Sequence, residues 1–252
     1  MSQAQMQLPA TGLEFKMERV VPFFQPIMNL ASNRVWRYEC LARLLGDNEH
    51  IFLPSEFLNI VEKENCNAEL THHIYEESRS YCKQRNMAWS INLADSDLDD
   101  ESVVAWLIHQ HQDSSSELFG IEISHHSLQA HLPVIGLLRQ KCPTLGISVD
   151  GVIQLSESLV KAMSLDLNAV KLDGDLVKSL SGSVRDVNSE DDSGDKKEKQ
   201  QFLLQELIAA CNKTNTRLVA EHIESQETLD AVTRLGIKFG QGFYLSSPEG
   251  RV

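Results

Sequence analysis

The sequence predicts an α/β fold, a modified (β/α)8 TIM-like barrel that opens with an antiparallel pair of strands. Three observations predict it. The chain has 252 residues, the usual size of a single (β/α) barrel. Strand-like segments alternate with helix-like ones, as in a parallel sheet with helical crossovers. Polar side chains follow most of the strands, and a closed barrel gathers strand ends in one ring, whereas an open sheet concentrates them at one switch point.

The first two strands form the expected hairpin. Residues 20–30 are mostly apolar but include Pro22 and Pro26, which favour an edge or an irregular position in a sheet. The turn-prone residues 31–33 separate this segment from a second strand over 35–43, in which aromatic and apolar residues alternate with polar ones. Such a short turn makes the second strand the antiparallel partner of the first.

The alternation then continues to the end of the chain. Pro54 opens the first helix, because proline is favoured in a first helical turn. Further helices are expected over 67–85, 97–112, 126–141, 154–164, 175–181, 201–215 and 225–235. Further strands are expected over 87–93, 118–123, 145–150, 168–172, 217–220 and 237–240.

The domain organisation is simple. Residues 1–18 are expected to form an N-terminal arm or helix, and residues 19–252 a single barrel domain. Within that domain, residues 181–200 contain almost no apolar side chain, so they cannot bury enough surface to offset the entropy of ordering. We therefore expect a disordered surface insertion. A solvated loop is the favoured interpretation of such a charge run, and a docking role is the alternative.

Composition excludes several classes of protein. The formal net charge is −13, which argues against binding long nucleic acid, because phosphate backbones are held by dense basic surfaces. The sequence has neither an apolar run long enough to span a membrane nor a secretory leader, so a cytoplasmic location is expected. The five cysteines include no C-x-x-C pair, which favours reduced thiols over disulfides or structural zinc.

A ring of polar residues at strand ends is the candidate site. Its members are Glu39, Asn92, Glu122, Asp150, Lys171, Glu221, Glu224 and Gln241. The first four offer only oxygen donors, which suit Mg²⁺ or Mn²⁺ better than zinc or copper. Crowded carboxylates need a cation, since they otherwise repel one another. Hydrolysis of a phosphate ester by metal-bound water is the chemistry of such a set. From spacing alone, a metal site and ordinary salt bridges remain equally open.

These residues lie in motifs that resemble, in order, those of the EAL-domain family of bacterial cyclic-di-GMP phosphodiesterases. The similarity covers nearly the whole chain. The matching segments are Phe24-Gln25-Pro26-Ile27 for Y-Q-P-I, Glu39-Cys40-Leu41-Ala42-Arg43 for E-A-L-L-R, Ile91-Asn92-Leu93 for I-N-L, Glu122-Ile123-Ser124 for E-(L/I)-T, Val170-Lys171-Leu172-Asp173 for L-K-I-D, Ala220-Glu221-His222-Ile223-Glu224 for A-E-G-V-E, and Gln241-Gly242-Phe243 for Q-G-Y.

The resemblance implies a role for each site residue. Glu39, Asn92, Glu122 and Asp150 would hold one Mg²⁺ or Mn²⁺ ion. The catalytic group would comprise Lys171 and Glu221, which position the attacking water, supported by Glu224 and Gln241. Ligand contacts would come from Gln25, Arg43, Asp173 and Phe243, with Arg43 meeting a phosphate and Phe243 stacking on guanine. The ligand would be cyclic-di-GMP.

The sequence also departs from the family pattern. The family's paired aspartates, D-D-F-G-T-G, appear here as Asp150-Gly151-Val152-Ile153-Gln154-Leu155. Gly151 therefore stands where the family has the aspartate of its second metal site, and the loop glycines are lost. His222 replaces a glycine next to Glu221, where it could clash, pair with Glu221 or point outward. The second metal site is therefore doubtful.

Two functional hypotheses follow. The favoured one is a catalytically impaired regulatory or nucleotide-binding module of cyclic-di-GMP signalling that retains one divalent-metal site. The alternative is an active but slow phosphodiesterase that hydrolyses cyclic-di-GMP to linear pGpG, recovering the second ion through Glu221, Asp173 or water. The first hypothesis is favoured because function depends on the site rather than on the fold. A regulatory protein partner is a further expectation, and the resemblance to the family also implies a homodimer joined through the barrel rim.

Overall fold

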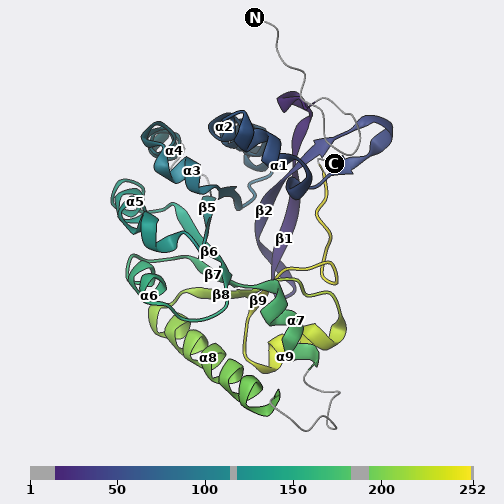
Figure 1. Ribbon diagram of the computed structural model, residues 1–252, viewed down its shortest axis with the longest axis vertical. Helices are drawn as coiled ribbons and strands as arrows, with labels where there is room; N and C mark the ends of the chain where they lie inside the picture. The colour runs from purple at the N-terminus through teal and green to yellow at the C-terminus, as the bar shows by residue number, and fades with distance from the viewer. Residues whose placement is uncertain (1–14, 114–117, 183–192, 251–252) are drawn as a thin grey trace, which may run out of the picture.

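The structure, a computed structural model, describes residues 15–113, 118–182 and 193–250. Its sheet runs in the order β1-β9-β8-β7-β6-β5-β4-β2-β3, and a further pairing of β1 with β2 closes it. Eight of these strands therefore form a barrel, to which β3 (Ile51–Phe52) adds a short edge on β2. Helices surround much of the barrel in Figure 1. The predicted barrel with an antiparallel opening pair is confirmed.

The opening hairpin consists of β1 (Val20–Asn29) and β2 (Arg34–Leu45). Its turn includes Asn33 at a φ of 50°, a left-handed conformation that asparagine tolerates well. The long hairpin pairs Gln25 with Glu39, which brings two predicted site residues side by side. β1 also runs antiparallel to β9 (Phe239–Gly240), but this pairing involves only the last two residues of β1. Both prolines of β1 thus lie beyond the β9 contact, as expected for edge-type positions.

The other barrel strands are parallel, and their carboxyl ends meet at one end of the barrel. They are β4 (Trp89–Leu93), β5 (Phe119–Ser124), β6 (Gly146–Val152), β7 (Ala169–Leu172) and β8 (Arg217–Ala220). The helices are α1 (Pro54–Lys63), α2 (Asn67–Gln84), α3 (Asp95–Asp99), α4 (Glu101–Asp113), α5 (Leu128–Lys141), α6 (Glu157–Met163), α7 (Gly174–Gly182), α8 (Ser193–Thr214) and α9 (Gln226–Arg234).

A continuous apolar core lies between the strands and these helices. Trp89 and Phe119 on neighbouring strands pack against Tyr75 of α2, with ring centroids 4.6–5.4 Å apart. Aromatic contacts of this kind add about 0.5–1.5 kcal/mol each beyond simple burial. The core fixes the strands from outside, so the polar side chains that point into the barrel can be held in place.

The structure differs from the sequence-based prediction in three places. The helix expected over 97–112 is two helices, because Asp100 is extended and its Oδ1 accepts hydrogen bonds from the N–H and hydroxyl of Ser102 at the start of α4. Aspartate is a favoured helix-capping residue. Strand β6 continues through Gly151 to Val152, past its expected end at 150. The short β3 was not predicted.

The structure describes only parts of the N-terminal arm expected over 1–18 and of the insertion expected over 181–200. Of the N-terminal arm, residues 1–14 lie outside the described residues, and Met17–Arg19 form a short 3-10 turn, η1, before β1. Of the insertion expected at 181–200, residues 183–192 lie outside the described residues. The prediction of a structureless loop is wrong for 193–200, which form the first turns of α8. Lysine, glutamate and glutamine, which dominate 196–200, are good helix formers.

Candidate active site

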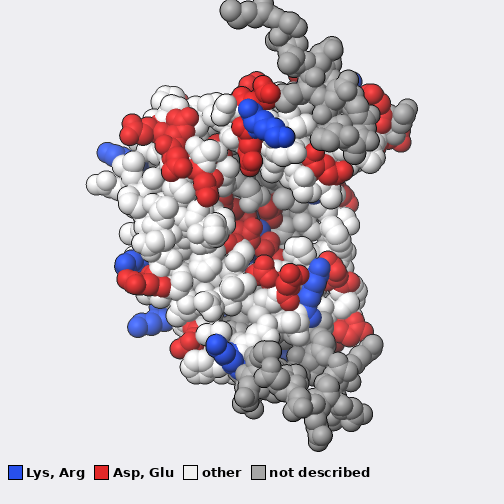
Figure 2. Space-filling model, viewed as in Figure 1, with Lys and Arg blue, Asp and Glu red and all other residues white. Residues whose placement is uncertain are grey.

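The carboxyl ends of the barrel strands surround a pocket of about 440 Å³. Figure 2 shows acidic side chains gathered in the hollow at the centre of this face. The pocket is lined by Gln25, Glu39, Leu41, Asp150, Lys178, Glu221, His222, Glu224, Gln241, Gly242 and Phe243. Most of the residues predicted from strand ends thus line one cavity, as expected for a barrel whose parallel strands end together.

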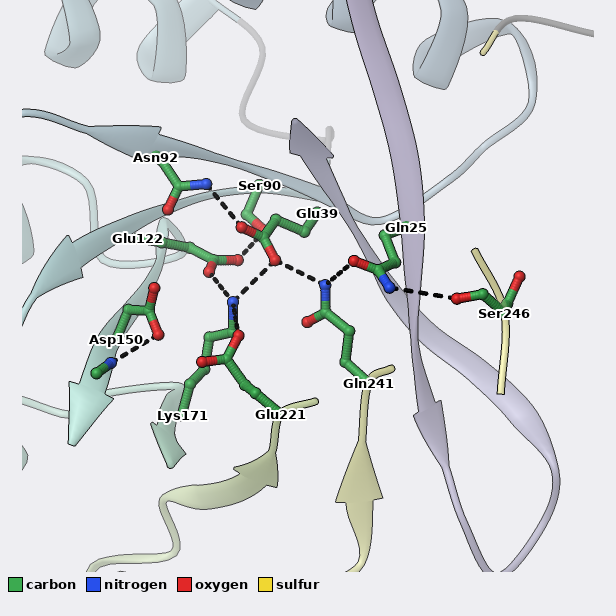
Figure 3. A network of polar contacts seen from close by, with 11 residues as sticks. Gln25, Glu39, Ser90, Asn92, Glu122, Asp150, Lys171, Glu221, Gln241 and Ser246 are labelled. Atoms are coloured by element: carbon green, nitrogen blue, oxygen red, sulfur yellow. Dashed lines mark hydrogen bonds and ion pairs between the residues drawn. The ribbon is translucent and has the colours of Figure 1, made fainter. Parts of the chain in front are cut away.

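Lys171 of β7 is the centre of the site (Figure 3). Its Nζ lies 2.9 Å from Glu39 Oε2, 2.7 Å from Glu122 Oε2 and 2.8 Å from Glu221 Oε1. The lysine side chain is only 1% exposed. Burial acts to lower its pKa, but the surrounding carboxylates outweigh burial and raise the pKa well above its ordinary value. Lys171 is therefore a permanent buried cation at neutral pH.

Glu39 of β2 is held by amide donors as well as by Lys171. Asn92 Nδ2 donates to Glu39 Oε1 at 2.7 Å, and Gln241 Nε2 donates to Glu39 Oε2 at 2.7 Å. The same Gln241 nitrogen donates to Gln25 Oε1 at 3.0 Å. Burial acts to raise the pKa of Glu39, yet Lys171 and these donors lower it below its ordinary value. Glu39 is therefore ionised.

Glu122 of β5 lies deeper in the barrel. Ser90 Oγ donates to its Oε1 at 2.5 Å, while Lys171 binds its other oxygen. Burial and the charge of Glu39 raise the pKa of Glu122, with Lys171 opposing them. Ser90 was missed at the sequence level. It stands two residues before Asn92 on β4 and therefore faces the same side of the sheet, which is the signal that identifies it.

Asp150 and Glu221 form a hydrogen-bonded carboxyl pair at the mouth. Burial raises the pKa of Glu221 well above its ordinary value, and the charge of Asp150 adds to this effect against the opposing Lys171. Burial also acts to raise the pKa of Asp150, but Lys171, Glu221 and the Gly151 N–H lower it overall. Of the two carboxyls, Glu221 therefore holds a proton more tightly than Asp150 does, as expected for neighbouring carboxyl groups in different surroundings.

The predicted rim and ligand residues are more scattered. Phe243 lines the pocket and is 66% exposed. Glu224 also lines it and pairs with Lys178 Nζ at 3.2 Å. The guanidinium of Arg43 donates to the carbonyl oxygen of Ala42 and does not line this pocket. A ligand contact for Arg43 remains a prediction.

Asp173 has a local structural role. Its Oδ1 accepts the backbone N–H groups of Asp175 and Leu176, so it caps the start of α7. A ligand contact for Asp173 likewise remains a prediction.

His222 and Lys178 are the rim residues whose place the sequence did not predict. His222 has a φ of 52°, the left-handed conformation for which glycine is the usual residue. Its ring lies over Gly174, where an added Cβ would come within 2.6 Å of the imidazole. The imidazole Nδ1 lies 3.8 Å from Glu224 Oε1. Of the three alternatives for His222, the structure supports a side chain that points to the rim without filling the cavity.

A hard divalent cation requires oxygen ligands that are free to approach it closely, and the four predicted metal donors were Glu39, Asn92, Glu122 and Asp150. All four lie at one end of the barrel, but both oxygens of Glu39 and both of Glu122 already accept hydrogen bonds from protein donors. Among the described residues, no three His, Cys, Asp or Glu side chains are arranged to hold a metal ion. In this arrangement the donor set does not fit Mg²⁺ or Mn²⁺, because an ion would have to displace Lys171.

The fold and the site define a barrel protein with an acidic, lysine-centred pocket at the carboxyl ends of its strands. Comparison of the sequence with protein families matches the EAL domain over residues 10–248. The chain therefore belongs to the EAL domain family. Within the described residues, no helix is both long and apolar enough to cross a membrane.

Known relatives share this domain at low identity. The chain is 26% identical over 238 residues to the cyclic di-GMP phosphodiesterase PdeB of Shewanella oneidensis, an alignment that covers 90% of this chain and 26% of that protein. The structure matches the FimX EAL domain from Pseudomonas aeruginosa bound to c-di-GMP, with a TM-score of 0.73 at 21% identity, covering 92% and 91% of the two chains. It also matches a Vibrio cholerae LapD S helix-GGDEF-EAL fragment bound to c-di-GMP, with a TM-score of 0.76 at 17% identity, covering 91% and 54%. At these identities the structural matches establish the fold.

Proposed function

We propose that this domain is a nucleotide-binding regulatory module of cyclic-di-GMP signalling with impaired phosphodiesterase activity. Named relatives that share the domain are cyclic di-GMP phosphodiesterases, which supports the ligand. The pocket of about 440 Å³, with exposed Phe243 at its rim, supports binding of a ligand with an aromatic base, because aromatic rings stack on one another. Gly151 supports the impairment, because it has no side chain to offer a second ion.

The expected loss of phosphodiesterase rate can be estimated. A two-ion site stabilises both the attacking and the leaving oxygen of a phosphodiester. Loss of one preorganised electrostatic element of this kind typically reduces the rate by about 10²–10³-fold. In addition, the carboxylates of Glu39 and Glu122 are engaged by Lys171, Ser90 and amide donors. The observation that carries the proposal is this saturated cluster beside a position without the second carboxylate.

A slow phosphodiesterase is the second candidate, and one observation favours it. Glu221 contacts both Lys171 and Asp150, as a group that positions a water molecule would require. In this proposal Lys171 and Glu221 orient the nucleophile. Gln241 holds Glu39 through a hydrogen bond, and Glu224 holds Lys178 at the rim through an ion pair. The reaction would need a divalent ion that the observed arrangement does not accommodate.

Titration calorimetry combined with a product assay distinguishes these functions. Purified protein is titrated with cyclic-di-GMP, and the same protein is incubated with nucleotide and Mn²⁺ while pGpG is quantified by chromatography. We expect saturable binding and little linear product. Turnover at the rate of an active relative such as PdeB, measured in parallel, would refute the proposal. Neither binding nor product would leave a protein-docking role. A regulatory partner and a homodimer remain predictions, and light scattering with and without nucleotide tests the dimer.

A further inference from the structure

Lys171 has the contacts that a bound cation would have in a cluster of carboxylates. Its ammonium touches Glu39 from β2, Glu122 from β5 and Glu221 after β8, all within 2.7–2.9 Å. Asp150 adds a fourth carboxyl group whose charge acts on the lysine. A buried carboxylate without a partner is strongly unfavourable, and a buried pair is stable only when its remaining oxygens are also hydrogen-bonded. In this site Lys171 is the charged partner, and neighbouring side chains hydrogen-bond the remaining carboxylate oxygens.

The remaining oxygens are occupied by neutral donors. Asn92 and Gln241 both direct an N–H group at Glu39, and Ser90 directs its hydroxyl at Glu122. A hard divalent ion needs carboxylate and amide oxygens that are free to approach it to about 2.0–2.6 Å. To admit such an ion, the site would have to move the ammonium and redirect Asn92, whose nitrogen rather than oxygen faces Glu39. Both changes break hydrogen bonds in a buried network.

We propose that Lys171 is the built-in cation of this site, so that the domain excludes Mg²⁺ and Mn²⁺ at rest and binds its nucleotide without a metal ion. The ammonium compensates the carboxylate charge that would otherwise repel an anionic phosphodiester. The part that concerns the nucleotide rests on the proposed function. The part that concerns metal exclusion rests on the contacts of Lys171 alone.

A titration with Mn²⁺ alone tests metal exclusion. Mn²⁺ is added to nucleotide-free protein, and the free ion is followed by electron paramagnetic resonance. We expect no saturable binding by the wild type below the millimolar range. Lys171→Gln removes the ammonium and frees the carboxylates, so it should bind Mn²⁺ at least about 10²-fold more tightly. This factor corresponds to the one to three pKa units by which a neighbouring opposite charge changes the proton affinity of a carboxylate.

The matched control is Lys178→Gln at the rim, where Lys178 pairs with Glu224 rather than with the buried cluster. It should leave Mn²⁺ binding as weak as in the wild type. Circular dichroism shows whether each variant is folded. If Lys171→Gln does not fold, the wild-type titration still decides, because micromolar Mn²⁺ binding by the wild type would overturn the proposal.

Nucleotide binding supplies the second measurement. Cyclic-di-GMP is titrated into wild-type protein in EDTA and again in Mg²⁺. Dissociation constants that agree within about threefold support the proposal, and binding that requires Mg²⁺ overturns it while the proposed nucleotide function stands. If nucleotide binds in neither buffer, the proposed function fails and with it the claim of metal-free binding. The Mn²⁺ titration then decides metal exclusion separately.

Discussion

Gly151 has the backbone and the surroundings to accept a larger residue. It follows Asp150 on β6 with a φ of 70°, and a Cβ added there would meet no heavy atom within 4 Å. The backbone is left-handed, which most side chains disfavour, but asparagine and aspartate are enriched several-fold at such positions. The structure around position 151 therefore has room for an aspartate, and steric crowding does not explain why glycine stands there.

If the domain is a slow phosphodiesterase, Gly151→Asp should increase Mn²⁺-dependent hydrolysis of cyclic-di-GMP by about 10²-fold, the usual contribution of one electrostatic element. If Lys171 excludes Mn²⁺, the rate should stay at the wild-type level. The added carboxylate would supply the ligand that the wild type lacks. Initial rates of pGpG formation measure the effect. Gly151→Asn is the matched control, because it has the same shape and backbone tolerance without the charge. Equal rates for the two variants would show that charge at 151 is not what limits the reaction.

The raised pKa of Glu221 predicts how stability depends on pH. Burial keeps Glu221 protonated in the folded chain at pH values where the unfolded chain, with an ordinary pKa of 4.5, has lost the proton. The folded state then binds more protons than the unfolded state, so stability falls as pH rises above about 4.5. The limiting slope for one proton is about 1.4 kcal/mol per pH unit.

Glu221→Gln should remove this slope. Glutamine keeps the shape and an N–H donor toward Asp150 but cannot ionise. Urea unfolding at several pH values between 5 and 8 measures the difference in the free energy of unfolding between variant and wild type. That difference should grow with pH in favour of the variant. Glu224→Gln, at a half-exposed rim position, is the control, and a parallel profile for Glu221→Gln would contradict the assignment of the proton.

At the scale of elements, the loop between β8 and α9 places Glu221, His222 and Glu224 around the pocket mouth. The loop is fixed at its start by the backbone bond from Gln241 N–H to the Ala220 carbonyl. At its end, Ser225 caps α9, because its Oγ accepts the N–H of Thr228 at 3.2 Å. The sequence predicts α9 from its pattern, whereas the conformation of the loop depends on the left-handed His222.

We predict that Ser225→Ala lowers the free energy of unfolding by about 1 kcal/mol, the usual contribution of a helix cap. Chemical denaturation measures the loss. Ser225→Asp, which retains a capping oxygen and a charge favourable to the helix N-terminus, should keep most of the stability. A loss of the same size for both variants would indicate that packing at 225, and not the cap, supplies the stabilisation.

At the scale of the whole molecule, a second buried cation lies inside the barrel. Arg37 of β2 is 7% exposed, and its guanidinium lies over the first residues of the neighbouring strands β5 and β6. A Cβ added at Gly146 would come within 2.5 Å of Arg37 Nη1 and 2.6 Å of Nη2. The glycine therefore leaves the space that the arginine fills, in accordance with the close packing of barrel interiors.

This contact predicts that substitutions at Arg37 and Gly146 have strongly non-additive effects on the free energy of unfolding. Gly146→Ala alone should destabilise the barrel by about 1–3 kcal/mol through overpacking. In an Arg37→Ala background the same change should cost little, which gives a coupling free energy of about 0.5–3 kcal/mol in a double-mutant cycle of unfolding. Gly136→Ala in α5, where an added Cβ meets nothing within 4 Å, is the neutral control. Additive effects at 37 and 146 would show that the backbone, not Arg37, limits the space.

The barrel, its antiparallel opening hairpin, the family and the residues at the strand ends could all be predicted from the sequence. These follow from local signals, because strand and helix periodicity, turn residues and motif spacing are all written along a few neighbouring residues. The prediction failed at Asp100, whose side chain divides a continuous helical pattern. It also failed at 193–200, where low apolar content predicted a loop but helix-forming residues extend α8.

The contacts among the polar residues could not be predicted in this way, because they depend on the folded arrangement of distant strands. Lys171 is separated by 132 residues from Glu39 and by 49 from Glu122, and no local pattern specifies that its ammonium lies between them. Closure of the barrel brings its ammonium within 3 Å of both carboxylates. Because these groups are buried, each carboxylate needs a hydrogen-bond donor. The fold supplies Lys171 as that donor among the residues that the sequence predicts to hold a metal ion.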